Sequence, residues 1–150
     1  MRIFGSAAFF LAVLTCLTLA SPAFAATPYV INGSGGDCPA IGTWNAGSLT
    51  CTLNRDVTVS GSAGIEITAN NITLDGAGHT VTGDGATNAA GIEAGSNTGI
   101  TIKNSIVQHF QDGIYFGFTG SSTITGNTAT LNFRTVIPLP ELLSTVFPTT

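Results

Sequence analysis

Glu66 and Glu93 are the residues whose types and spacing are best suited to joint chemistry. Each is the acid of a Gly-Ile-Glu triplet, and a third copy of the triplet carries Tyr115 at that position. If the copies stack, the two carboxylates lie about one strand spacing (~4.8 Å) apart and repel each other. That repulsion raises one pKa or is relieved by a bound cation such as Ca²⁺. We favour the interpretation that Glu66 and Glu93 are two solvated glutamates on a surface sheet, and we expect no cofactor; a Ca²⁺ site at these two residues is kept as the alternative.

Other polar residues are expected to have structural roles. Asp75 and Lys103 share a position in a second repeated block and should form a surface ion pair, which contributes little to stability. Asp75 also begins a turn that continues through Gly76, Gly78 and His79. His109 falls in the register of Gly83, so the two histidines should not stack. A copper site would need converging His, Met or Cys ligands, and we expect none here.

The cysteines predict a disulfide. Cys16 lies in the apolar N-terminal segment, which leaves Cys38 and Cys51 in the rest of the chain. Two cysteines in an oxidising compartment usually pair, and closing this short loop would stabilise the fold by about 3 kcal/mol. The alternative is a redox or metal pair, but two thiols with no nearby His or third Cys make a poor zinc site.

The N-terminal segment 1–25 has the pattern of a secretory signal peptide. Arg2 is the only charge before the apolar run from Phe9 to Ala20, and Ala23-Phe24-Ala25 supplies small residues for cleavage after Ala25. A membrane anchor is disfavoured because the run is shorter than ~20 residues and no basic cluster follows it. We expect a mature chain that is secreted, periplasmic or at the cell surface, with no membrane span.

The charge balance of the mature chain argues against two classes of partner. Loss of Arg2 leaves three basic residues, Arg55, Lys103 and Arg134, against eight acidic ones, a formal charge of −5. Such a chain lacks the basic patch that binds nucleic acid or an anionic membrane surface. We expect neither partner.

Three short blocks recur in the same order along the chain. They cover residues 64–67, 91–94 and 113–116; then 72–75, 100–103 and 122–125; and then the neighbourhoods of Val81, Val107 and Ala129. The last two copies of every block are separated by the same spacing. Each block alternates apolar with polar residues, which is typical of a strand with one buried face. Gly, Asn, Ser and Thr separate the blocks and supply turns.

Three strands per turn of about 22 residues predict an all-β parallel β-helix, a single-stranded solenoid of about three to four rungs. Equivalent side chains of successive rungs should then form inward columns. The expected columns are Ile65, Ile92 and Ile114; Ile67, Ala94 and Phe116; and Leu74, Ile102 and Ile124. A β-sandwich is the alternative for a strand-rich chain, but it predicts antiparallel hairpins and no such columns.

These motifs resemble a known group of proteins. Residues 72–83 (Ile-Thr-Leu-Asp-Gly-Ala-Gly-His-Thr-Val-Thr-Gly) look like the opening rung of the pectate-lyase-like superfamily. Residues 99–104 and 112–127 resemble the repeats of NosD-type periplasmic proteins, and the segment from Cys38 to Cys51 is similar to the N-terminal caps of such secreted proteins. The resemblance implies a right-handed coil with a disulfide-stapled cap. In resembling polysaccharide lyases, stacked acidic side chains on an outer sheet face hold Ca²⁺.

The resemblance does not select an activity, because similar rungs occur in lyases, hydrolases, adhesins and accessory proteins. The acidic triad and the Arg-Ile-Lys element of polygalacturonases are missing, and residues 101–104 echo that element only superficially. We therefore assign no catalytic residue. The first hypothesis is a non-catalytic exported module that binds a polysaccharide or cell-envelope glycan. The alternatives are a fragment of a polysaccharide lyase or hydrolase, and a NosD-type periplasmic accessory protein.

Four segments follow from these observations. They are the signal peptide (1–25), the N-terminal cap with the first strands (26–63), the rungs (64–134) and a non-repeat tail (135–150). The tail could plug the exposed rung, since Pro140 suits a first helical turn. It could instead be a relic of truncation or frame shift in a longer gene, which the abrupt change of composition at Arg134 favours.

Overall fold

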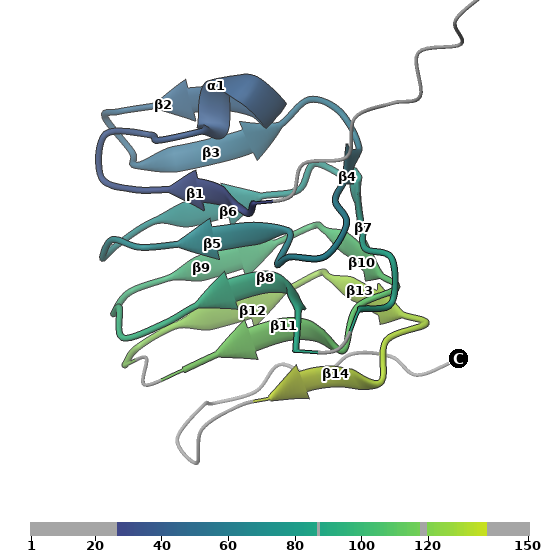
Figure 1. The fold of residues 1–150 in the computed structure, drawn as a ribbon. Helices are drawn as coiled ribbons and strands as arrows, with labels where there is room; N and C mark the ends of the chain where they lie inside the picture. The colour runs from purple at the N-terminus through teal and green to yellow at the C-terminus, as the bar shows by residue number, and fades with distance from the viewer. Residues whose placement is uncertain (1–26, 87, 118–119, 138–150) are drawn as a thin grey trace, which may run out of the picture.

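The fold is a coil of short strands stacked along one axis (Figure 1). The computed structural model describes residues 27–86, 88–117 and 120–137, so the expected signal peptide and residues 138–150 lie outside it. Among the helices described, none has the length and apolar character needed to cross a membrane.

The strands form three sheets within the described residues. The first sheet has the order β1 (Tyr29–Ile31), β5 (Ile65–Ile67), β8 (Ala90–Ala94), β11 (Asp112–Phe116) and β14 (Arg134–Ile137). The second has the order β2 (Gly42–Asn45), β3 (Thr50–Leu53), β6 (Thr73–Asp75), β9 (Thr101–Lys103) and β12 (Thr123–Thr125). The third has the order β4 (Val57–Thr58), β7 (Thr80–Thr82), β10 (Ile106–Gln108) and β13 (Thr128–Thr130). The chain visits the sheets in rotation, so β5–β6–β7, β8–β9–β10 and β11–β12–β13 are three successive turns.

The predicted parallel β-helix and its inward columns are confirmed. Ile65 pairs with Ile92 and Ile92 with Ile114, while Leu74, Ile102 and Ile124 stack in the second sheet. The side chains of Ile65, Ile92 and Ile114 are fully buried. Because successive rungs place apolar side chains directly over one another, one continuous core runs along the axis. The right-handed sense of the coil stays a prediction.

The glycines of the first two Gly-Ile triplets, Gly64 and Gly91, leave room for neighbouring core side chains. A Cβ built on Gly91 would lie 2.1 Å from Cγ1 of Val107 and 2.9 Å from Cδ2 of Phe110. A Cβ on Gly64 would lie 2.7 Å from Cγ1 of Val81 and 3.3 Å from Cζ of Phe110. Side chains from the third sheet and the following turn therefore occupy the space that larger residues would need.

An N-terminal cap covers the first turn (Figure 1). It combines α1 (Cys38–Ile41) with an antiparallel pairing of β2 and β3, the exception in a ladder that is otherwise parallel among the described strands. The predicted disulfide is present: Cys38 and Cys51 are bonded, with their Cα atoms 5.8 Å apart. It joins α1 to β3, and both cysteines are fully buried.

The strand stack continues past the expected end of the rungs at residue 134. β14 pairs in parallel with β11, placing Arg134 beside Asp112, Val136 beside Ile114 and Ile137 beside Tyr115. Parallel pairing therefore continues as far as Ile137, while the division into rungs (64–134) and a non-repeat tail (135–150) stays a prediction. The missed strand lacks the Gly-Ile triplet, and a β-branched Thr-Val-Ile sequence replaces it. The expected tail from residue 138 onward lies outside the described residues.

Candidate functional site

A pocket of about 210 Å³ lies on the outer side of the first sheet, over β8, β11 and β14. Its lining combines an aromatic ring, three charged groups and two carboxamides. The lining residues are Asn88, Ala90, Glu93, Gln111, Asp112, Tyr115 and Arg134. Glu93 and Tyr115 face outward because each lies between two buried residues of its strand.

The expected stacking of Glu66, Glu93 and Tyr115 is present. Glu66 on β5 pairs with Glu93 on β8, and Glu93 pairs with Tyr115 on β11. All three side chains are partly exposed. The register therefore places two carboxylates on successive rungs, with the tyrosine ring on the rung that follows.

Asp112 and Arg134 also line this pocket, and neither was predicted as a site residue. Asp112 is 8% exposed. Nη2 of Arg134 donates a hydrogen bond to Oδ2 of Asp112 at 3.0 Å, and Nε lies 2.6 Å from Oδ1. The Nε contact is an ion pair without hydrogen-bond alignment: Oδ1 of Asp112 accepts no hydrogen bond among the described residues. The guanidinium thus neutralises the most buried carboxylate of the site. A comparison of positions one repeat apart would have paired these two residues.

The pKa of Glu93 is raised above its ordinary value. Burial is the largest cause, and the charges of Glu66 and Asp112 add to it. Arg134 pairs with Asp112, whereas no hydrogen bond or ion pair of the Glu93 carboxylate occurs among the described residues. Of the two carboxylates that line the pocket, Glu93 is therefore the one whose charged form a nearby cation or hydrogen-bond donor would stabilise.

Gln111 and Asn88 form the polar rim. The backbone N–H of Asn88 donates to Oε1 of Gln111, and the backbone N–H of Gln111 donates to the carbonyl of Ala89 at 3.1 Å. These bonds hold the loop before β8 against the turn before β11. The carboxamide nitrogen of Gln111 stays a possible donor to a ligand, since its oxygen already accepts this bond.

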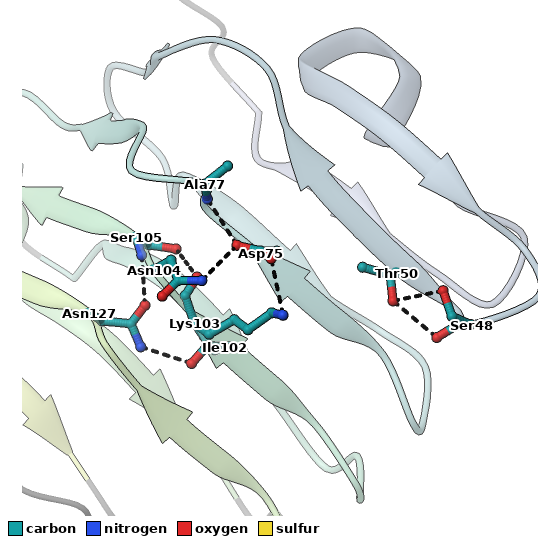
Figure 2. Close-up of polar contacts among 9 residues, drawn as sticks. All are labelled: Ser48, Thr50, Asp75, Ala77, Ile102, Lys103, Asn104, Ser105 and Asn127. Atoms are coloured by element: carbon teal, nitrogen blue, oxygen red, sulfur yellow. Dashed lines mark hydrogen bonds and ion pairs between the residues drawn. The ribbon is translucent and has the colours of Figure 1, made fainter.

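The expected ion pair of Asp75 and Lys103 is present on the second sheet (Figure 2). Nζ of Lys103 lies 3.1 Å from Oδ2 of Asp75. Oδ1 of Asp75 accepts bonds from the backbone N–H of Ala77 at 3.0 Å and from Nδ2 of Asn104 at 3.1 Å. Burial raises the pKa of Asp75, but these bonds together with Lys103 outweigh it and hold the pKa below its ordinary value. The pair therefore fixes a turn and lies away from the pocket residues.

A second interaction in the same region was not predicted. Asn127 is 4% exposed; its Oδ1 accepts from the backbone N–H of Ser105 at 2.9 Å, and its Nδ2 donates to the carbonyl of Ile102 at 2.8 Å (Figure 2). The side chain thus joins two rungs at a corner where the backbone turns. Ser105 and Asn127 are one repeat apart, as Asp112 and Arg134 are.

The two histidines lie apart from the pocket lining. Nδ1 of His79 is 3.2 Å from Oδ1 of Asp56, which also accepts from the backbone N–H of Thr80 at 2.9 Å. The Thr80 bond and then His79 lower the pKa of Asp56. This gives His79 a structural role in its turn. His109 has a positive φ of 60° in the turn before β11. In the described part of the chain, no group of three or more His, Cys, Asp or Glu could hold a metal ion.

No family model, curated protein or solved structure matches this chain. The structural class of this protein is therefore defined by its fold alone, which is an all-β parallel solenoid with a disulfide-linked cap. The candidate site is the pocket over β8, β11 and β14, and the pectate-lyase-like and NosD-type resemblances stay predictions.

Proposed function

We propose that this protein is an exported β-solenoid module that binds a polysaccharide in the pocket lined by Glu93, Tyr115 and Gln111. A pyranose ring presents C–H groups on its faces and hydroxyls around its edge. It can pack on an aromatic ring while its hydroxyls bond to carboxylate and carboxamide groups. The observation that carries the proposal is this combination of groups in one pocket on an outer sheet face.

Export is part of the proposal. The N-terminal segment 1–25 has the pattern of a signal peptide, and the disulfide between Cys38 and Cys51 suits an oxidising compartment. The pocket lies outside the core columns, so a long polymer could cross the sheet while one of its units enters the pocket.

Binding to immobilised polysaccharides tests the proposal. The purified mature protein should bind at least one polysaccharide, and Tyr115→Ala should reduce the affinity by about tenfold, as expected for the loss of an aromatic contact. Phe133→Ala is the matched control, because Phe133 is 77% exposed and is not part of the pocket lining. Equal loss in both variants, or no binding to any polysaccharide, would contradict the proposal.

A glycoside hydrolase fragment is the second candidate, and the raised pKa of Glu93 favours it. Hydrolysis of a glycosidic bond needs one protonated and one ionised carboxyl group. Glu93 and Asp112 line the same pocket, and the raised pKa of Glu93 suits a general acid. Release of reducing ends that stops in Glu93→Gln would support the hydrolase; binding without cleavage supports the module.

Ca²⁺ at Glu66 and Glu93 is also retained as a proposal. The supporting observation is that these carboxylates pair on adjacent strands and are partly exposed. Calorimetric titration with Ca²⁺ should show heat that disappears in the Glu66→Gln, Glu93→Gln double variant. The NosD-type accessory role stays a prediction from the resemblance.

A further inference from the structure

We infer that the pocket takes a sugar unit with a free, protonated amino group, such as a hexosamine unit of a deacetylated amino-sugar polymer, with the ammonium against Glu93 and Tyr115. This inference rests on the proposed function, because it names the ligand class of the same site.

The charge distribution around the pocket favours a cation. Glu66, Glu93 and Asp112 place three carboxylates on or beside the site, and Arg134 is the one cationic side chain among the described residues that line it. Arg134 contacts both oxygens of Asp112, so its charge is largely used there. The excess negative charge therefore lies at Glu93 and Glu66. A uronate unit would meet repulsion at this point, whereas an ammonium would meet attraction.

Tyr115 adds a second reason. It is the register neighbour of Glu93 on the next strand, and both line the pocket. An ammonium over the ring face is attracted by the ring electrons, and the nearby carboxylate adds Coulomb attraction to the same group. Glu93 also lacks an ion-pair partner of its own among the described residues, so the ligand would supply the missing charge.

The dimensions and rim favour a sugar over a basic peptide. The volume of about 210 Å³ is below the range of ~300–1,000 Å³ typical of drug-sized ligand pockets, so the site holds one small unit of a larger ligand. Gln111 and Asn88 at the rim offer carboxamides that match ring hydroxyls. A lysine side chain would leave these groups without partners.

The experiment compares three oligosaccharides of equal length by calorimetry at low ionic strength. They are a β-1,4-linked glucosamine oligomer, its fully N-acetylated form and an oligogalacturonate; a short polylysine is the fourth probe. We expect binding in the order glucosamine, N-acetylglucosamine, galacturonate. The preference for the free amine should weaken as salt is added.

Two variants, one that removes a negative charge and one that removes a positive charge, distinguish electrostatic attraction of the ligand from structural damage. Glu93→Gln should weaken binding of the glucosamine oligomer by about fivefold or more, while binding of the acetylated form changes little. Arg134→Gln removes positive charge and should tighten glucosamine binding. Structural damage would not strengthen binding, so this sign difference is diagnostic; circular dichroism and thermal melts check that both variants fold.

Each remaining outcome has a distinct meaning. Tyr115-dependent binding that prefers the acetylated or uronate oligomer would overturn the amino-sugar assignment and leave the proposed function standing. Tighter binding of polylysine than of any sugar would assign the pocket to a basic peptide instead. Failure of every polysaccharide to bind would overturn the proposed function together with this inference.

Discussion

Arg134 lies one rung after Asp112 in the stack, and its guanidinium contacts both oxygens of the Asp112 carboxylate. This relationship links β14 to β11 by side chains as well as by backbone pairing. It also divides the acidic groups of the pocket: Asp112 is neutralised, whereas Glu93 is left with a raised pKa. A buried carboxylate is stable only when it is paired, so Arg134 stabilises Asp112, whereas the Glu93 carboxylate has no ion-pair partner among the described residues.

The Cys38–Cys51 disulfide should stabilise the cap. The bond closes a loop with a sequence separation of 13, and constraining the unfolded chain in this way contributes about 3 kcal/mol. The double variant Cys38→Ala, Cys51→Ala should therefore unfold at lower urea concentration than the oxidised protein. Reduction of the wild type should produce a similar shift. Mass spectrometry that finds two alkylatable thiols in the folded protein would show that the pairing is wrong.

The inward column of the second sheet predicts unequal costs for neighbouring residues. Ile102 is fully buried between Leu74 and Ile124, so Ile102→Asp places an unpaired charge in the core and should prevent folding. Thr101→Asp is the matched control, because Thr101 is partly exposed on the outer face, and it should cost less than about 1 kcal/mol. Far-ultraviolet circular dichroism and urea unfolding distinguish the two. Equal tolerance of both substitutions would refute the register.

Sequence periodicity was sufficient to predict the fold because its determinants are local and repeated. Columns of apolar residues at a fixed spacing specify stacking of parallel strands, as Ile92 and Ile114 show. β14 was missed because the prediction relied on the Gly-Ile triplet. The register needs a β-branched strand at the right spacing, which Thr135 and Val136 supply without the triplet.

The candidate site was only partly predictable. The stacking of Glu66 and Glu93 follows from the strand period, but the pocket also needs the loop that carries Asn88 and the turn that carries Gln111. The conformation of a turn does not follow from strand periodicity, so the positions of Asn88 and Gln111 in the pocket could not be predicted from the sequence. The contact between Asp112 and Arg134 could have been predicted from the repeat spacing, because the two residues are one repeat apart. The same spacing relates Ser105 to Asn127.

The turn at Gly76 should reject any larger side chain. A Cβ at this position would lie 2.4 Å from Oγ of Ser105 and 2.6 Å from the carbonyl oxygen of Asn104. Because the Asn104 contact is with backbone, relief needs movement of the next rung, and Gly76→Ala should destabilise the fold by about 1–3 kcal/mol. Gly95→Ala is the control, since a Cβ there meets no atom within 4 Å. Thermal melts that show equal effects would contradict this packing.

Glu93→Gln should stabilise the folded protein at neutral pH, because burial, Glu66 and Asp112 all disfavour the charged form of Glu93. The folded-state pKa lies above 4.5, the ordinary value for a glutamate, which approximates the unfolded chain. The contribution of Glu93 to stability is therefore fully present below the unfolded pKa and is lost as pH rises through the folded pKa. Since Glu93 is partly exposed, the gain in the variant should be less than about 1 kcal/mol.

Urea unfolding of both proteins across a pH series measures this effect. The free-energy difference between Glu93→Gln and wild type should grow from low to neutral pH and then level off. Glu66→Gln should reproduce part of the gain, because it removes one of the two charges that repel Glu93. Asp75→Asn is a control whose effect on stability should have the opposite sign. The folded pKa of Asp75 is lowered, so the contribution of Asp75 to stability is present above the unfolded pKa and is lost as pH falls through the folded pKa. A difference between Glu93→Gln and wild type that stays constant with pH would show that Glu93 carries no excess repulsion. The same result would remove the electrostatic reason for a cationic ligand.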